Sequence, residues 1–388
     1  MGMLLNQSTS LRMRFVGLLI LVSTITGCSL FGSDDDRNKP MPLVDFKPTV
    51  SAQIAWRAPV GSSVAFGLSP TVVGDSIFAA SADGVVTKVD LATGAVQWKM
   101  TVAKKLSAGA GSDGKTTAVA TPEGEIIALD EAGAIKWTSR ATSDVSVQPW
   151  VGLGVVVVRS GDYRIQAFNA ANGERIWSVQ RPGPSLALRV AQQMIAVEGL
   201  VITGLPGGRL MAIEPLAGSV VWEGIVAAPR GSSELERVND VVGSPVVLGD
   251  FLCAVSFQGR ISCFNISQGG RVIWAQDFSS STGMAIDAKN AYSPDARDNV
   301  AAFATADGAK VWRQDGLRNR RLTAPATTGQ YVVVGDFEGY AHVLSANSGE
   351  FAARLALSGG AMYAQAQTTS RGVLLQTGDS SLVMIELK

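Results

Sequence analysis

The residues of this chain that could carry side-chain chemistry are few. Its 388 residues include three cysteines, Cys28, Cys253 and Cys263, and a single histidine, His342. A zinc site needs several Cys or His ligands and a His-based nucleophilic dyad needs a partner, so this set offers little material for either. His342 lies in an apparent strand, Tyr340–Leu344, without a nucleophile partner in the sequence, and we expect it to be structural. We therefore predict a protein with no catalytic residues, no metal site and no cofactor.

Cys253 and Cys263 flank a Gln258-Gly259 turn. A two-residue turn would pair Cys253 with Phe264 and place the two thiols on opposite faces of the hairpin, whereas only an odd-length loop would align them. An oxidising compartment would permit a disulfide. We nevertheless expect two free, buried cysteines.

The composition favours a single large all-β body over the two or three domains that the length alone would suggest. There are 42 glycines and 15 prolines beside 46% hydrophobic and only 17% charged residues, as in many short strands joined by tight turns. Lys plus Arg equals Asp plus Glu at 33 each, so no basic surplus is available to neutralise nucleic-acid phosphates. We expect no nucleic-acid partner.

The N-terminus is typical of an export signal. Arg12 and Arg14 precede the apolar run Phe15–Ile25, which has the length of a signal-peptide core and is too short to span a membrane. The run ends in Ile25-Thr26-Gly27-Cys28, which resembles the bacterial lipobox, so we predict a lipoprotein signal peptide over residues 1–27. Lipid on Cys28 would anchor the protein without spanning the bilayer. The alternative is an ordinary signal peptide that happens to contain a cysteine.

A flexible tether is expected to follow the lipidated cysteine. Residues 28–50 contain three consecutive aspartates at 34–36 and three prolines, a composition that cannot bury a core. We therefore place the tether over residues 28–50 and the folded domain over residues 51–388.

An internal repeat predicts the fold of that domain. Six tryptophans end a Gly-x-x-x-Trp motif, at Gly94 and Trp98, Gly133 and Trp137, Gly173 and Trp177, Gly218 and Trp222, Gly270 and Trp274, and Gly308 and Trp312. The steps between these tryptophans are 39, 40, 45, 52 and 38 residues. A period of this size, with about four short strands per unit, is typical of a β-propeller blade. We expect each indole to fill the gap between neighbouring blades.

The last blade must be completed by the N-terminus. A seventh unit has Ala353 in its tryptophan slot, and the chain ends before an eighth unit reaches its outer strand. Trp56 lies 42 residues before Trp98 and supplies that strand. The result is an eight-bladed β-propeller closed by an N-terminal strand, which removes exposed sheet edges. Trp150 falls outside the pattern and is expected in the core or at the rim.

The repeat resembles the pyrroloquinoline-quinone-type propeller repeat. Quinoprotein dehydrogenases share this repeat with a non-enzymatic lipoprotein family, and the fold alone does not choose between them. The resemblance implies that a dehydrogenase would carry a quinone, a Ca²⁺ ion, a catalytic Asp and commonly a disulfide of adjacent cysteines. Cys253 and Cys263 are not adjacent, and no Ca²⁺ ligand set can be assigned. A periplasmic quinoprotein dehydrogenase remains the alternative, and a sugar- or peptide-binding propeller is a further one.

Two irregular segments are similar to the other family, the outer-membrane protein assembly factors called BamB. They are Pro184–Arg189 and the lengthened connection Arg230–Asp240. The resemblance implies a non-enzymatic scaffold of the β-barrel assembly (BAM) complex that binds the POTRA domains of BamA and other members of the complex. Nascent outer-membrane proteins are further candidate partners. In that family, Ser29 rather than Asp after the lipidated cysteine implies the outer membrane, facing the periplasm.

The same resemblance implies a docking face at Leu186, Leu188 and Arg189, with Asp240 nearby. In this proline-flanked loop the two leucines would present an apolar patch, and Arg189, a residue type enriched at interface hot spots, would be its polar anchor. The alternative is that both leucines cap the propeller core. Where the family often has a second acidic residue, two positions after Asp240, this chain has Val242.

Overall fold

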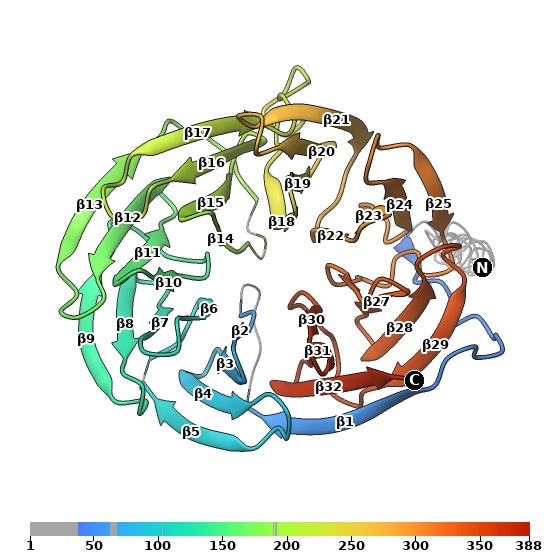
Figure 1. Ribbon diagram of the computed structural model, residues 1–388, viewed down its shortest axis with the longest axis horizontal. Coiled ribbons are helices and arrows are strands. Elements are labelled where there is room, and N and C mark those ends of the chain that lie inside the picture. The colour runs from blue at the N-terminus through green and yellow to red at the C-terminus, as the bar shows by residue number, and fades with distance from the viewer. Residues whose placement is uncertain (1–37, 63–67, 103, 189, 191) are drawn as a thin grey trace, which may run out of the picture. The chain divides into compact units, whose positions relative to one another are not determined.

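The computed structural model describes residues 38–62, 68–102, 104–188, 190 and 192–388. The predicted signal peptide, Cys28 and the first part of the tether lie outside these residues. Within them, 32 strands form eight four-stranded antiparallel sheets arranged as a ring (Figure 1). The expectation of an all-β, eight-bladed propeller is confirmed. No helix among the described residues combines the length and the apolar character needed to cross a membrane.

The first four blades follow one another along the chain, each running from its innermost to its outermost strand. The first contains β2 (Thr71–Val73), β3 (Ser76–Ala80), β4 (Val85–Asp90) and β5 (Val96–Thr101). The second contains β6 (Ala108–Ser112), β7 (Thr117–Ala120), β8 (Glu125–Leu129) and β9 (Ile135–Arg140). The third contains β10 (Trp150–Gly152), β11 (Val155–Arg159), β12 (Arg164–Asn169) and β13 (Arg175–Gln180). The fourth contains β14 (Ile195–Val197), β15 (Leu200–Leu205), β16 (Arg209–Ile213) and β17 (Val220–Ile225).

The remaining blades continue this order until the last. The fifth contains β18 (Val241–Leu248), β19 (Phe251–Ser256), β20 (Gly259–Asn265) and β21 (Arg271–Phe278). The sixth contains β22 (Ala285–Ile286), β23 (Asn290–Pro294), β24 (Val300–Ala304) and β25 (Lys310–Gln314). The seventh contains β26 (Ala326–Thr327), β27 (Tyr331–Gly335), β28 (Tyr340–Ser345) and β29 (Phe351–Ala356). The eighth joins β30 (Gln367–Thr369), β31 (Gly372–Gln376) and β32 (Ser381–Leu387) to β1 (Ala52–Pro59).

The ring is closed by the pairing of the two ends of the domain. Strand β1 pairs antiparallel with β32, from Ala52 opposite Leu387 to Pro59 opposite Ser381 (Figure 1). Trp56 is buried in this pair and packs on the first blade. The predicted closure through Trp56 is confirmed.

The Gly-x-x-x-Trp motif is explained by contacts between neighbouring blades. The Trp56 Nε1 donates a hydrogen bond to the Leu91 carbonyl at 3.1 Å, in the turn that contains Gly94. Gly94 has φ +73°, and a Cβ at this position would lie 2.7 Å from the indole. Glycine is therefore required both by the turn and by the close approach of the ring. The same close approach of an indole to a glycine joins each later tryptophan of the series to the next blade, ending with Trp312 and Gly349.

Trp150, the tryptophan outside the series, begins the innermost strand β10 and is half-buried. Its position agrees with the expectation of a core or rim residue.

A segment before β1 lies along the seventh blade, and we call residues 41–50 the strap. The Met41 amide donates to the Arg318 carbonyl at 2.9 Å, and the Met41 carbonyl accepts from Arg320 Nη1 at 2.9 Å. Further along, Arg354 Nη2 donates to the Val44 carbonyl at 2.9 Å. The backbone of the strap is thus held by one hydrogen bond to the backbone of the ring and by two from arginine side chains.

Side chains of the strap also pack on the blade. Phe46 stacks on Phe351 with ring centroids 5.3 Å apart, and the amides of Thr49 and Val50 donate to the Ala352 carbonyl at 2.9 and 3.4 Å. Val50 packs against the apolar cluster of the one blade whose tryptophan slot holds alanine. The prediction of a flexible tether over residues 28–50 is therefore wrong for residues 41–50, because stacking and hydrogen bonds fix this proline-rich segment.

Candidate docking site

The loop that joins the third and fourth blades presents one leucine outward and one inward. Leu186 is 45% exposed, whereas Leu188 packs partly buried against an apolar cluster of the fifth blade. The sequence left open whether the leucines form a docking patch or cap the core. Leu186 is exposed and available to a partner, whereas Leu188 covers the core. Arg189, the third predicted residue of this face, lies outside the described residues.

The carboxylate of Asp240 holds the backbone of this loop by a hydrogen bond. Asp240 is only 1% exposed, and its carboxylate accepts hydrogen bonds from the Leu188 amide at 2.5 Å and from the Gly207 amide at 2.9 Å. The structure thus brings Asp240 and Leu188 together as expected from the resemblance. The carboxylate holds the loop backbone instead of facing solvent, so its contribution to docking would be indirect.

Val242, the departure from the family pattern, is buried. It lies in the same cluster as Cys253, Cys263 and Met284, against which Leu188 packs. An apolar side chain fits this position, because an unpaired carboxylate there would be desolvated.

The lengthened connection between the fourth and fifth blades is exposed at its tip. Residues 231–237 are exposed, so the charged side chains of Glu234, Glu236 and Arg237 lie in solvent. Hydrogen bonds from the backbone amides of Ser233 and Ser232 lower the pKa of the Glu236 carboxyl. The Glu236 carboxylate therefore holds the backbone of its own loop at Ser232 and Ser233.

Arg159 is a residue of this region that the sequence analysis missed. It ends β11 and is 9% exposed, and its guanidinium donates to the Gly204 carbonyl and to Gln192 Oε1. Gln192 in turn donates from Nε2 to the Val241 carbonyl at 2.5 Å. The sequence signal was a cation directly after four valines, at the end of a strand that is otherwise entirely apolar.

Cys253 and Cys263 form a disulfide, so the prediction of free thiols is wrong. The two residues are directly opposite in the β19–β20 pair, where Val255 is opposite Ile261. This register leaves Phe257, Gln258 and Gly259 between the strands, an odd-length loop that places both cysteines on one face. The expectation that both cysteines are buried is confirmed, with 0% exposure for each.

His342 belongs to a buried charge network in the seventh blade. Its Nε2 lies 2.8 Å from Asp336 Oδ2, and Arg320 Nη2 lies 2.7 Å from the same oxygen. Burial lowers the pKa of His342 below its usual value, although Asp336 opposes the shift. Burial alone would raise the pKa of Asp336, but hydrogen bonds from His342, the Tyr340 amide and Arg320 hold it below its usual range. Each member has a structural partner, as expected for His342.

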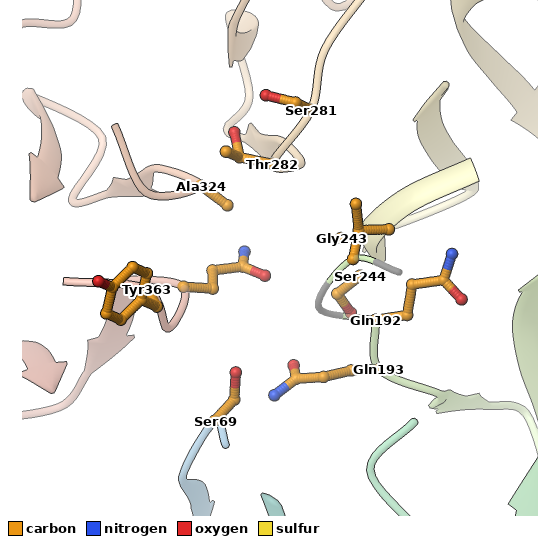
Figure 2. Close-up of a pocket in the computed structure, with 11 residues that line it drawn as sticks. Ser69, Gln192, Gln193, Gly243, Ser244, Ser281, Thr282, Ala324 and Tyr363 are labelled. Atoms are coloured by element: carbon orange, nitrogen blue, oxygen red, sulfur yellow. The ribbon is translucent and has the colours of Figure 1, made fainter. Parts of the chain in front are cut away.

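A small polar cavity lies among the segments that lead into the innermost strands (Figure 2). Figure 2 shows Gln192, Gln193, Ser69, Thr282 and Tyr363 around it. The cavity has a volume of about 40 Å³ and no charged side chain in its lining.

Glutamines hydrogen-bond across the neighbouring blades at this level. Gln193 Nε2 donates to Gln148 Oε1 at 2.7 Å, and Gln148 Nε2 donates to the Ala110 carbonyl at 2.7 Å. Gln367 Nε2 donates to the Pro70 carbonyl at 2.7 Å. Gln148 Nε2 also donates to Thr71 Oγ1, so these side-chain hydrogen bonds link the first, second, third, fourth and eighth blades around the centre of the ring.

The cavity does not fit the cofactor of the alternative prediction. Cofactor pockets usually have volumes of roughly 300–1,000 Å³. A neighbouring cavity of about 360 Å³ reaches that size, but neither lining contains the cations that a quinone bearing carboxylates would need. Within the described ranges, no group of three or more His, Cys, Asp or Glu side chains is arranged to hold a metal ion. The residues present at this centre do not match a quinoprotein dehydrogenase.

Comparisons with known proteins agree with the fold and the repeat. A family model described as outer membrane protein assembly factor BamB matches residues 82–314 and 296–388. The protein of that name from Bordetella pertussis is 60% identical over 369 residues, which cover 95% of each chain. The crystal structure of BamB from Moraxella catarrhalis matches with a TM-score of 0.79 at 24% identity, covering 87% of this chain and all of that one.

A quinohemoprotein alcohol dehydrogenase is a more distant structural neighbour. The enzyme from Comamonas testosteroni matches with a TM-score of 0.66 at 13% identity, covering 86% of this chain and 76% of that one. At this identity the likeness extends to the fold alone.

Proposed function

Because the chain belongs to the BamB family of outer-membrane protein assembly factors, we propose that it is a non-enzymatic scaffold of the BAM complex. In this proposal the signal peptide of residues 1–27 is removed, and lipid on Cys28 holds the protein at the outer membrane, facing the periplasm. The propeller binds the POTRA domains of BamA and assists the folding and insertion of β-barrel proteins. Other members of the complex and nascent barrel proteins are further partners.

The observation that carries this proposal is the exposure of Leu186 on a loop whose backbone is fixed. The side chain is 45% exposed, and the Leu188 amide two residues later is held by the buried carboxylate of Asp240. An apolar side chain presented from an ordered loop costs little conformational entropy on binding, which favours an interface anchor. Leu188 and Asp240 then act as supports, and Arg189 is included in the proposal as a further contact residue on the basis of the family resemblance alone.

The test is the affinity of Leu186→Asp for the periplasmic POTRA domains of BamA. Since a hot-spot residue contributes about 2 kcal/mol or more, we expect the dissociation constant to rise about 30-fold. Leu153→Asp is the matched control, because Leu153 is also exposed, at 61%, but lies in the turn between β10 and β11. Wild-type affinity in Leu186→Asp, with an unchanged β-sheet circular dichroism spectrum, would overturn the proposed site.

A further inference from the structure

We infer that Arg159, although it does not reach a partner itself, is the residue that positions the Leu186 loop for docking. This inference rests on the proposed function, because it identifies what holds the proposed binding loop in place. Arg159 is 9% exposed, so its role must be exerted through the residues around it.

One guanidinium links three consecutive blades beneath this loop. Arg159 extends from β11 of the third blade and donates to the Gly204 carbonyl on β15 of the fourth. Its second contact is Gln192, whose amide donates to the Val241 carbonyl on β18 of the fifth blade at 2.5 Å. Gln192 also forms an isolated parallel bridge with Gly243. Arg159 therefore fixes the point where the chain leaves the loop.

The beginning of the loop is anchored by the hairpin that follows Arg159. Tyr163 lies four residues after Arg159, the last residue of β11. Its hydroxyl donates a hydrogen bond to the Pro184 carbonyl at 3.0 Å. A cleft of about 280 Å³ lies between this hairpin and the loop, and it is lined by Arg159, Tyr163, Leu186 and Leu188 among others. Both ends of the loop thus depend on the region around Arg159.

The charge of Arg159 also stabilises the support at Asp240. Burial lowers the pKa of Arg159 to about 10, and the negative charge of Asp240 opposes this shift, so the guanidinium stays protonated at neutral pH. Asp240 is 1% exposed, and a positive charge nearby favours a buried carboxylate. Without the charge of Arg159, the Asp240 carboxylate would gain by moving toward water, and this movement weakens its bond to the Leu188 amide.

Loss of this support should reach the partner through Leu186. The Leu188 amide is two residues from Leu186, so a mobile backbone at Leu188 spreads the exposed leucine over several positions. Binding must then order the loop, and the cost appears as weaker affinity.

Arg320 provides a matched control for the loss of a buried arginine. It is 2% exposed and bound to Asp336 and to the Met41 carbonyl in the seventh blade, in a network that does not include the loop. Arg320→Gln should lower the thermal midpoint without changing affinity for the partner. Arg159→Gln should lower the thermal midpoint and also weaken binding, because it disturbs the fold and the loop together.

The experiment uses the full lipidated protein in detergent, with Arg159→Gln, Arg159→Lys and Arg320→Gln compared with wild type. We expect Arg159→Gln to weaken binding of the BamA POTRA domains about tenfold or more and to accelerate hydrogen exchange at the Leu188 amide. Arg159→Lys keeps a positive charge near Asp240 and should recover much of both properties. Arg320→Gln should leave both at wild-type values.

Two results would overturn the inference. One is unchanged exchange at Leu188 in Arg159→Gln, and the other is a loss of affinity in Arg320→Gln equal to that in Arg159→Gln. Exchange is measured on the free protein, so it decides the role of Arg159 even if the wild type does not bind BamA. In that case the proposed function fails while the positioning of the loop is still tested. If Arg159→Gln does not fold, Gln192→Ala takes its place in both measurements, because it removes the link from Arg159 to the fifth blade, and unchanged exchange at Leu188 in that variant would likewise overturn the inference.

Discussion

Replacing Cys253 and Cys263 together with alanine should destabilise the propeller by about 2.7 kcal/mol. The disulfide closes a loop with a sequence separation of 10 residues, and the loss of loop-closure entropy in the unfolded chain gives roughly this value. For a domain of about 350 residues, this corresponds to a fall in the thermal midpoint of about 4 °C. Because both cysteines are fully buried, the cavity left by the two lost sulfur atoms adds a further small penalty.

The assay should separate the covalent link from the change in side-chain volume. A chain beginning at Ser29 contains only these two cysteines, so thiol titration after unfolding counts them directly. The wild-type chain is unfolded with and without a reducing agent. The reducing agent breaks the S–S bond and adds only a hydrogen to each sulfur, so both side chains keep their size. The double-alanine variant is the control, since its midpoint should not respond to the reducing agent.

The reasoning would be refuted by two titratable thiols in the unfolded, unreduced wild type. It would also be refuted if the wild-type midpoint were the same in both solutions. Either result would mean that the opposed cysteines of β19 and β20 are not linked or that their link does not restrict the unfolded chain.

Two other predictions concern contacts inside the ring. Trp137→Phe should lower stability by about 1 kcal/mol in denaturant unfolding, because it removes the 3.0 Å hydrogen bond from Nε1 to the Ala170 carbonyl; Trp222→Phe should cost less, since no hydrogen bond of its Nε1 is found among the described residues, and equal losses would contradict the role given to the bond. His342→Gln should reduce the loss of stability between pH 7.5 and 5.5, because a folded-state pKa below the usual 6.5 means that the unfolded chain binds more protons as the pH falls; thermal midpoints at the two pH values test this, and an equal fall in wild type and variant would show that His342 does not contribute.

The repeat was readable from the sequence because seven of the eight junctions between blades use a tryptophan and a glycine for the same contact. The glycine of each turn and the indole of the preceding blade must meet, so both types recur at the blade period. The ring closure could also be predicted, because the last unit lacks an outer strand and the segment around Trp56 is a strand without a blade of its own. These features depend on local patterns repeated many times.

The features that the sequence did not predict depend on single residues. The disulfide depended on whether one hairpin loop had two or three residues, a difference that reverses the face of every later side chain. The fixed strap depended on Phe46 meeting Phe351, which lies about 300 residues away in the chain. Arg159 was missed because a charged residue at the end of a strand usually faces solvent, and only the fold shows that three blades enclose it.

The candidate docking residues were predicted from family resemblance, and the described ones have different surroundings in the structure. Leu186 faces outward, whereas Leu188 and Asp240 are held in the layer beneath it. The sequence could not separate these roles, because two leucines in a loop carry no information on which one the loop turns toward the core.

The pairing of β1 with β32 has a consequence for the order in which the protein forms. Seven blades are built from consecutive residues and can assemble as the chain emerges, but the eighth cannot form until the last residues are present. Bringing Ala52 to Leu387 closes a loop of more than 300 residues, which costs on the order of 5 kcal/mol of chain entropy before any contact is gained. While the chain emerges from its N-terminus, strand β1 must therefore stay unpaired until the last residues arrive, and this interval is when the nascent chain is most exposed to proteases and to self-association.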